Sequence, residues 1–307
     1  MVQIKRLKGA KLRWALKSGK FVYTFASLIP SPKHELKERE VLTISQCIHP
    51  FIDGTGMAKA ARQLPQGFLE QGNEIRVFMP KFGCINERRH QLHEVIRLSG
   101  MNLIINDTDH ALLIKVASVP SARMQVYFID NEEYFKRKAV TEDANEKFYA
   151  DNDERALFFC RGVLETVRKL GWSPDIIHCH GWMAGFIPLY VRHFFNDDPH
   201  FEDAKIIFSA YDEAPEALDK NLAKKLALEG FDKEVLKGMG KGTTEDLVKW
   251  AIGMSDAVVK GSPKLSRGMD TAIKASEKPI LAYAKDADER LNGHLEFFQS
   301  VMEEALV

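Results

Sequence analysis

Short runs of apolar and β-branched residues alternate along most of this chain with longer segments of helical apolar spacing. The clearest unit predicts a strand at 40–45, a glycine-containing loop, a helix at 57–71 and a second strand at 74–80. A helix that links two neighbouring strands in this way forms a right-handed crossover between parallel strands. The alternation therefore predicts an α/β fold with a doubly wound, parallel, Rossmann-like sheet. Further strands are predicted at 112–118, 123–129, 175–179, 205–211 and 257–260, and further helices at 153–170, 182–195, 263–276 and 284–306.

The domain organisation follows from charge and from this alternation. The first 34 residues contain lysine and arginine but no acidic residue. We expect residues 1–38 to be a basic, poorly ordered extension, with a basic arm or a membrane-surface helix as the alternatives. Residues 39–285 are predicted to form one Rossmann-like domain, followed by a C-terminal helix at 286–307. The segment 81–111 is polar and rich in turn residues, so it is expected to be an irregular excursion beside the strand ends.

Composition excludes several classes of protein. The formal net charge is +0, so a nucleic-acid partner is not expected. No apolar run reaches the roughly 18 residues that a membrane span needs. The cysteines are far apart and form no Cys-x-x-Cys motif, which argues against a disulfide or zinc framework and fits a cytoplasmic location. They are Cys47, Cys84, Cys160 and Cys179.

The segment 174–182 carries the most chemistry. It predicts a buried strand that ends in His178 and His180 and turns at Gly181 into the next helix. Ligands of open α/β sheets bind at the carboxyl ends of strands, so His180 is a candidate contact for a sugar or a phosphate. We expect the two imidazoles to point to opposite faces, which argues against a shared metal ion. The alternative is that His178 is buried and hydrogen-bonded and that His180 only lines a cleft.

The loop before the first helix is weaker evidence. Gly54-Thr55-Gly56 begins like a dinucleotide fingerprint, but Lys59 stands where the third glycine of that motif belongs. A tight turn from strand to helix is therefore the preferred interpretation. An anion is still able to bind at this helix N-terminus, where free N–H groups gather, although Asp53 opposes it.

Several segments, in this order, resemble the N-terminal catalytic domain of bacterial glycogen and plant-type starch synthases, which are GT-B glycosyltransferases. The resemblance implies transfer of glucose from ADP-glucose to an α-1,4-glucan, with retention of configuration and no other cofactor or metal. It also implies that the active site lies between two Rossmann-like halves. The matching segments are VLTISQ (41–46), GTGMAKAARQLPQGFLEQGNEIRVFMPKF (54–82), DNDERALFFCRGVLE (151–165), PDIIHCHGWMAGFIPLYV (174–191), KIIFSAYD (205–212) and DLVKWAIGMSDAVVKGSPKLSRGM (246–269).

Three polar positions depart from the family pattern. Asp53 stands where the family's Lys-Thr-Gly-Gly-Leu motif has the lysine that supports the donor phosphates. Gly181 replaces the acid of the His-Asp-Trp motif, and Tyr211-Asp212 replaces a His-Asn pair. An anion near a pyrophosphate is unfavourable in a cleft of low dielectric constant. The resemblance still implies substrate contacts by Gly56, His180, Trp182 and Tyr211, with His180 as the only catalytic candidate.

The function that these patterns imply is synthase-like. Only about 40 residues follow the last matching segment, so we expect the second GT-B half to be lacking and the chain to be weak or inactive by itself. The alternative is a non-catalytic regulatory protein that binds an α-glucan or docks on a synthase. The open cleft face is then expected to bind a partner synthase subunit or a second copy of the chain.

Overall fold

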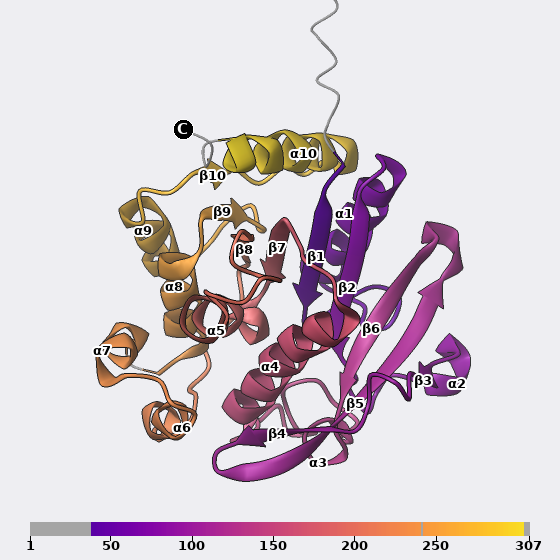
Figure 1. Cartoon of the computed structure of the whole chain (residues 1–307). Coiled ribbons are helices and arrows are strands. Elements are labelled where there is room, and N and C mark those ends of the chain that lie inside the picture. Colours follow the sequence, from indigo (N-terminus) through magenta and orange to yellow (C-terminus); the bar gives the residue numbers. More distant parts are fainter. Residues whose placement is uncertain (1–37, 241, 304–307) are drawn as a thin grey trace, which may run out of the picture. The chain divides into compact units, whose positions relative to one another are not determined.

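The computed structural model describes residues 38–240 and 242–303, so the predicted basic extension lies almost entirely outside the described residues. Its centre is one mixed sheet (Figure 1). Neighbouring strands run parallel from β10 to β6, and β5 runs antiparallel to β6 and β3. In spatial order the strands are β10 (Ile280–Leu281), β9 (Ala257–Lys260), β8 (Lys205–Ala210), β7 (Ile176–His180), β1 (Glu40–Ser45), β2 (Glu74–Pro80), β6 (Met124–Asp130), β5 (Thr108–Val119) and β3 (His93–Glu94).

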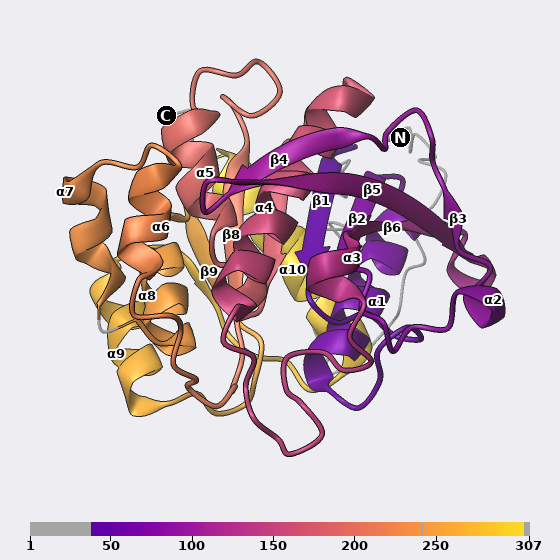
Figure 2. The same cartoon turned by 90° about the horizontal axis from the view of Figure 1, so that it is seen from below.

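The helices form layers on both faces of this sheet. Helix α1 (Gly56–Glu70) and helix α10 (Ala287–Glu303) lie on one face, whereas α4 (Asn152–Leu170) and α5 (Ile187–Phe194) lie on the other (Figures 1 and 2). Helix α8 (Thr244–Met254) packs against α5, and α9 (Arg267–Ala275) packs against α8. The predicted α/β, Rossmann-like architecture is confirmed. Within the described residues, no helix combines the length and apolar composition that crossing a membrane requires.

Local sequence signals explain where the main helices begin and end. Thr55 is the N-cap of α1, and its side chain accepts a hydrogen bond from the backbone N–H of Ala58. Gly171 ends α4 in the left-handed conformation, with φ of 65°. Thr243 and Asp246 form a capping box at the start of α8. Each cap satisfies backbone groups that the helix end would otherwise leave unpaired.

The region predicted as an irregular excursion contains a hairpin. Strand β4 (Met101–Ile105) pairs antiparallel with β5 through a turn at Asn106 and Asp107, whose φ angles are 50° and 61°. Both residue types tolerate positive φ, and two such residues form the tight turn that favours hairpins. The prediction was therefore wrong in leaving this stretch without strands. A short helix, α2 (Glu87–His90), precedes the hairpin.

Two other segments differ from the predicted elements. The single helix expected at 182–195 is broken into a 3-10 turn at Trp182–Ala184 and helix α5, because Pro188 has no N–H to donate back into the preceding turn. The charged stretch after β8, for which no helix was predicted, forms α6 (Leu222–Leu228) and α7 (Lys233–Leu236). Helix α3 (Glu132–Phe135) is a further short element.

Helix α10 packs closely on α1. A Cβ atom on Gly67 of α1 would lie 2.4 Å from Cδ2 of Leu291, so the glycine permits the close approach of the two helices. Phe298 of α10 is buried, with its ring 5.2 Å from that of Phe68 and 5.1 Å from that of His178. The turn before α10 is thereby held above the carboxyl ends of the parallel strands.

Candidate functional site

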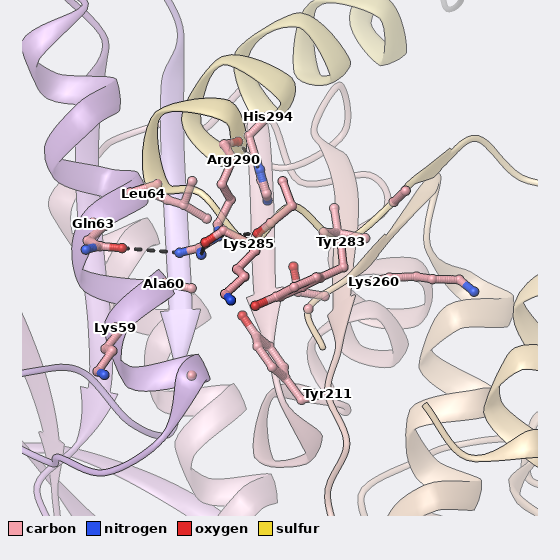
Figure 3. Close-up of a pocket in the computed structure, with 17 residues that line it drawn as sticks. Lys59, Ala60, Gln63, Leu64, Tyr211, Lys260, Tyr283, Lys285, Arg290 and His294 are labelled. Atoms are coloured by element: carbon pink, nitrogen blue, oxygen red, sulfur yellow. Dashed lines mark hydrogen bonds between the residues drawn. The ribbon is translucent and has the colours of Figure 1, made fainter. Parts of the chain in front are cut away.

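A pocket of about 340 Å³ lies at the carboxyl ends of β8 and β9 and beside the start of α1 (Figure 3). Parallel strands end at a common edge, which is where open α/β sheets bind ligands. The segment between β10 and α10 forms the opposite wall. The lining residues that matter for its chemistry are Gly56, Lys59, Gln63, Tyr211, Lys260, Tyr283, Lys285, Arg290 and His294.

The polar lining of this pocket is cationic. No aspartate or glutamate belongs to its lining. Lys260 turns toward α9, where its amine lies 2.6 Å from a carboxylate oxygen of Asp270. Lys59, Lys285 and Arg290 form no ion pair with any residue that the structure describes. The pocket therefore carries an excess of positive charge, to which the N-terminal end of the α1 dipole adds.

Arg290 is held in place by neutral acceptors. Its guanidinium donates hydrogen bonds to the Gln63 side-chain oxygen at 3.2 Å, to the Ala284 carbonyl at 3.1 Å and to the Lys285 carbonyl at 2.9 Å. These bonds fix the position of the side chain and do not neutralise its charge. Figure 3 shows Arg290 between α1 and the turn that precedes α10.

Behind the pocket, buried polar side chains form a continuous chain of hydrogen bonds. Ser209 Oγ lies 2.7 Å from His178 Nε2, His178 Nδ1 lies 3.2 Å from His180 Nε2, and His180 Nδ1 lies 2.7 Å from the Tyr211 hydroxyl. The prediction that the two imidazoles point to opposite faces was wrong, because residues i and i+2 of a strand share a face. Their ring centroids lie 4.0 Å apart.

Burial keeps these histidines uncharged. Both His178 and His180 are 0% exposed. Desolvation lowers the pKa of His180 to about 3 and the pKa of His178 well below its ordinary value. Neutral imidazoles suit metal ions, yet no group of three or more metal-binding side chains gathers within residues 38–240 and 242–303.

The four predicted substrate contacts do not share one cavity. Gly56 and Tyr211 line the pocket. His180 lies behind Tyr211, bonded to its hydroxyl and shielded from solvent. Trp182 packs against Phe148, with ring centroids 5.6 Å apart, and lines a separate small hollow of about 20 Å³.

The positions that depart from the family pattern make contacts outside the pocket. The exposed carboxylate of Asp53 pairs with the His49 imidazole in the loop before α1, and Asp53 does not line the pocket. Gly181 has φ of 76°, and a Cβ atom there would lie 2.5 Å from Cε of Met57. Asp212 is exposed beside the small hollow, and its backbone N–H donates to Ser262 Oγ at 3.0 Å.

Sequence reasoning missed a carboxyl group at this edge of the sheet. Glu213 accepts hydrogen bonds from Gln46 Nε2 at 2.9 Å and from the backbone N–H of Trp182 at 3.2 Å. Desolvation raises the pKa of Glu213 to about 7. It also lines the small hollow beside Trp182. Its place shortly after a predicted strand was the one signal available.

The cationic side chains were missed as well. Lys285 and Arg290 come from the last helix and the turn before it, far along the chain from Lys59, and the uncharged His294 lies on the same helix. Arg290 and His294 are four residues apart and therefore lie on one face of a helix. This spacing was the one feature of the sequence that indicated that the two side chains line the same pocket. Their approach to α1 depends on the packing of α10 and could not be read from spacing alone.

Comparison with known proteins gives the family of the chain. The starch synthase catalytic domain family model matches residues 40–275. Glycogen synthase of Chlorobaculum parvum is 34% identical over 248 residues, covering 77% of this chain and 50% of that protein. Glycogen synthase of Chlorobium limicola is 40% identical over 173 residues, covering 56% of this chain and 35% of that protein. The chain thus spans about half or less of the length of these relatives.

A solved structure supports the same fold. The catalytic domain of starch synthase IV from Arabidopsis thaliana, bound to ADP and acarbose, is similar with a TM-score of 0.67 and 19% sequence identity. The similarity covers 82% of this chain and 52% of that one. Together with the family match, it confirms the resemblance inferred from the ordered segments. The chain belongs to the starch synthase catalytic domain family.

Proposed function

We propose that this protein acts in α-glucan metabolism as a synthase-like lobe that binds ADP-glucose and α-glucan but transfers glucose weakly or not at all by itself. The observation that carries the proposal is the state of the strand end at His180. That imidazole is uncharged, sealed behind Tyr211 and followed by Gly181, which offers no carboxylate.

Glucosyl transfer from a nucleotide sugar requires stabilisation of charge on the departing phosphate and close polar contacts to the sugar. Asp53 places an anion where the family has a cation, and contact between His180 and a sugar would require Tyr211 to move. We propose that Gly56 and Tyr211 contact the substrate in the pocket and that Trp182 contacts it beside the pocket. His180 supports this arrangement through its hydrogen bond with the Tyr211 hydroxyl. These residues can bind substrate, but they do not supply the charge stabilisation that transfer of glucose requires.

The same reversal of charge at Asp53 favours a second candidate. In it, the protein is a non-catalytic regulator that binds an α-glucan or docks on a synthase subunit or on a second copy of itself. Both candidates place the protein in the cytosol with its substrates, and the four cysteines are free thiols, as that compartment requires.

Isothermal titration calorimetry of the purified full chain separates the candidates. Binding of ADP-glucose and maltoheptaose supports the synthase-like lobe. Binding of maltoheptaose without ADP-glucose supports the regulator that binds a glucan. Failure of both ligands to bind contradicts the proposal and leaves docking on a synthase, which a pull-down with purified glycogen synthase then measures directly.

A further inference from the structure

We propose that Glu213 and Gln46 cap the turn that begins at Trp182, which Gly181 cannot do, and that Glu213 thereby positions the Trp182 side chain for contact with an α-glucan. Glu213 is a positioning residue, because it acts through Trp182 and does not itself touch the sugar. Contact between Trp182 and a glucan is part of the proposed function, on which this role of Glu213 rests, whereas the capping does not depend on it.

The first two backbone N–H groups of the turn after β7 need acceptors from outside it. Residues 182–184 form a 3-10 turn that follows Gly181. The N–H of Ala184 bonds to the Gly181 carbonyl at 3.2 Å, which leaves those of Trp182 and Met183. An N-cap side chain commonly accepts from such groups, and a glycine has none to offer.

Two side chains from the neighbouring strand ends supply these acceptors. Glu213 Oε2 accepts from the backbone N–H of Trp182 at 3.2 Å, and Gln46 Oε1 accepts from that of Met183 at 3.0 Å. Gln46 Nε2 in turn donates to Glu213 Oε1 at 2.9 Å. Gln46 follows β1 and Glu213 follows β8, and these two strands flank β7 in the sheet (Figure 1). Three strand ends are thus joined at the base of Trp182.

The three hydrogen bonds allow one arrangement of donors and acceptors. The Met183 N–H can only donate, so Gln46 turns its oxygen toward the turn and its amide nitrogen toward Glu213. Glu213 therefore faces two donors, and a carboxylate accepts from both. A protonated acid or an amide at this position presents a donor to one of them, so one of the two bonds is lost.

Glu213 changes its charge near neutral pH. Desolvation raises its pKa to about 7, although both hydrogen bonds favour the carboxylate. The titratable groups around it are Asp212, Tyr211, Cys47 and Glu245, which pairs with Lys249 at 2.6 Å. Burial raises the pKa of Cys47 to about 12 and also raises that of Tyr211, so both stay uncharged near neutral pH. The complete set of three bonds therefore belongs to the ionised Glu213, which predominates above about pH 7.

The cap matters for the Trp182 side chain because Gly181 precedes it. A glycine adopts many backbone conformations at similar cost, so it does not fix the direction in which the chain leaves β7. The two outside acceptors supply that constraint. The Trp182 ring then packs against Phe148, with centroids 5.6 Å apart, and forms part of the wall of the small hollow. A lost cap therefore loosens the ring that the proposed function places against a sugar.

An exchange of the two side chains tests the capping by urea unfolding of the full chain at pH 8. Glu213→Gln sets two amide donors against each other, and Gln46→Glu sets two carboxylates against each other. The double variant restores all three bonds with the carboxylate at position 46, so its urea midpoint should lie above the value obtained by adding the two single shifts. Glu202→Gln, an exposed glutamate before β8, is the matched control and should leave the midpoint unchanged. Additive single shifts overturn the proposal.

The indole N–H resonance of Trp182, assigned by its loss in Trp182→Phe, reports the positioning. In the unchanged chain its chemical shift should follow a titration with an apparent pKa of about 7, because the cap is complete only when Glu213 is ionised. Glu213→Gln should abolish this titration and Glu202→Gln should retain it. A resonance that does not change between about pH 5.5 and about pH 8.5 in the unchanged chain overturns the positioning role.

Calorimetry with maltoheptaose measures the consequence for glucan binding. The dissociation constant of the unchanged chain should rise about threefold from pH 8 to pH 6, and Glu213→Gln should bind about threefold more weakly at pH 8 with no dependence on pH. The double variant should recover the affinity at pH 8. Glucan binding that neither pH nor Glu213→Gln changes overturns the positioning role. Failure of the unchanged chain to bind maltoheptaose contradicts the proposed glucan contact, whereas the urea and resonance measurements still decide the role of Glu213.

Discussion

Substituting Gly181 by alanine is expected to lower the free energy of unfolding by about 2–6 kcal/mol, because the backbone and the space at this position both require glycine. Its φ and ψ angles are 76° and 173°, a combination that residues with a Cβ atom rarely adopt. A conformation of this kind costs a non-glycine residue about 1–3 kcal/mol.

The second contribution comes from the neighbours of the new methyl group. It would lie 2.5 Å from Cε and 2.9 Å from Sδ of Met57, and 3.1 Å from the side-chain oxygen of Gln46. Overpacking of a buried site costs about 1–3 kcal/mol. Methionine is flexible, so this part of the loss is the more variable of the two.

Urea unfolding of four proteins measures the two contributions separately. They are the unchanged chain, Gly181→Ala, Met57→Ala and the double variant. In the Met57→Ala background, the glycine substitution should cost about 1–3 kcal/mol, which is the backbone part alone. The difference between this cost and its cost in the unchanged chain is the coupling energy, which measures the steric overlap with Met57. A loss below about 0.5 kcal/mol in Gly181→Ala, within the range of ordinary surface substitutions, would refute the reasoning. The same geometry predicts that Gly181→Asp, which restores the family's acid, destabilises the protein and fails to raise glucosyl transfer.

Three further predictions concern charge. Lys225→Met should cost about 3–5 kcal/mol in urea unfolding, because three carboxylates within 2.8 Å of its amine lose their cation, whereas Lys224→Met on the exposed side should cost less than about 0.5 kcal/mol. The pKa values of the buried histidines are lowered, so below about pH 6.5 the unfolded chain binds more protons than the folded one, and the free energy of unfolding decreases as the pH falls. His294→Gln should reduce this decrease by up to about 1.4 kcal/mol per pH unit, which urea unfolding at pH 6.5 and pH 5 measures. Asp53→Lys should tighten ADP-glucose binding about threefold at low salt, and loss of the gain at 0.5 M salt would confirm its electrostatic origin, whereas no gain at low salt would contradict it.

The order of strands and helices was predictable because β1, β2, β7, β8 and β9 are short, mostly buried runs and because α1, α4 and α8 each have a cap at one end. The unit from β1 through α1 to β2 was predicted to within a residue or two, since Gly72 and the apolar spacing mark its boundaries. Strand β5 was predicted from residue 112 onward, but β4 and the turn that joins it to β5 were missed, because β4 is short and only half buried and its pattern is weak. Helices α6 and α7 were missed because charged side chains in this stretch form ion pairs that no local pattern shows, as at Lys225.

The candidate site was predictable only in part. Parallel topology places Gly56 and Tyr211 at one edge of the sheet, and both line the pocket. The cationic wall depends on α10 packing against α1 at Gly67, a contact between segments more than 200 residues apart. The burial of His180 depends on the hydroxyl of Tyr211 from the neighbouring strand end. Such facts belong to tertiary packing, which spacing within one segment does not encode.

The most direct test of the central claim is the transfer of radiolabelled glucose from ADP-glucose to glycogen by the purified full chain, with a glycogen synthase of the same family as the positive control. The claim is that the strand end at His180 and Gly181 binds substrate without activating it. We predict that the chain incorporates less than about one thousandth of the label that the control incorporates, because removing even one stabilising group of an active site costs a factor of about 100–1000. Incorporation within tenfold of the control would contradict the account.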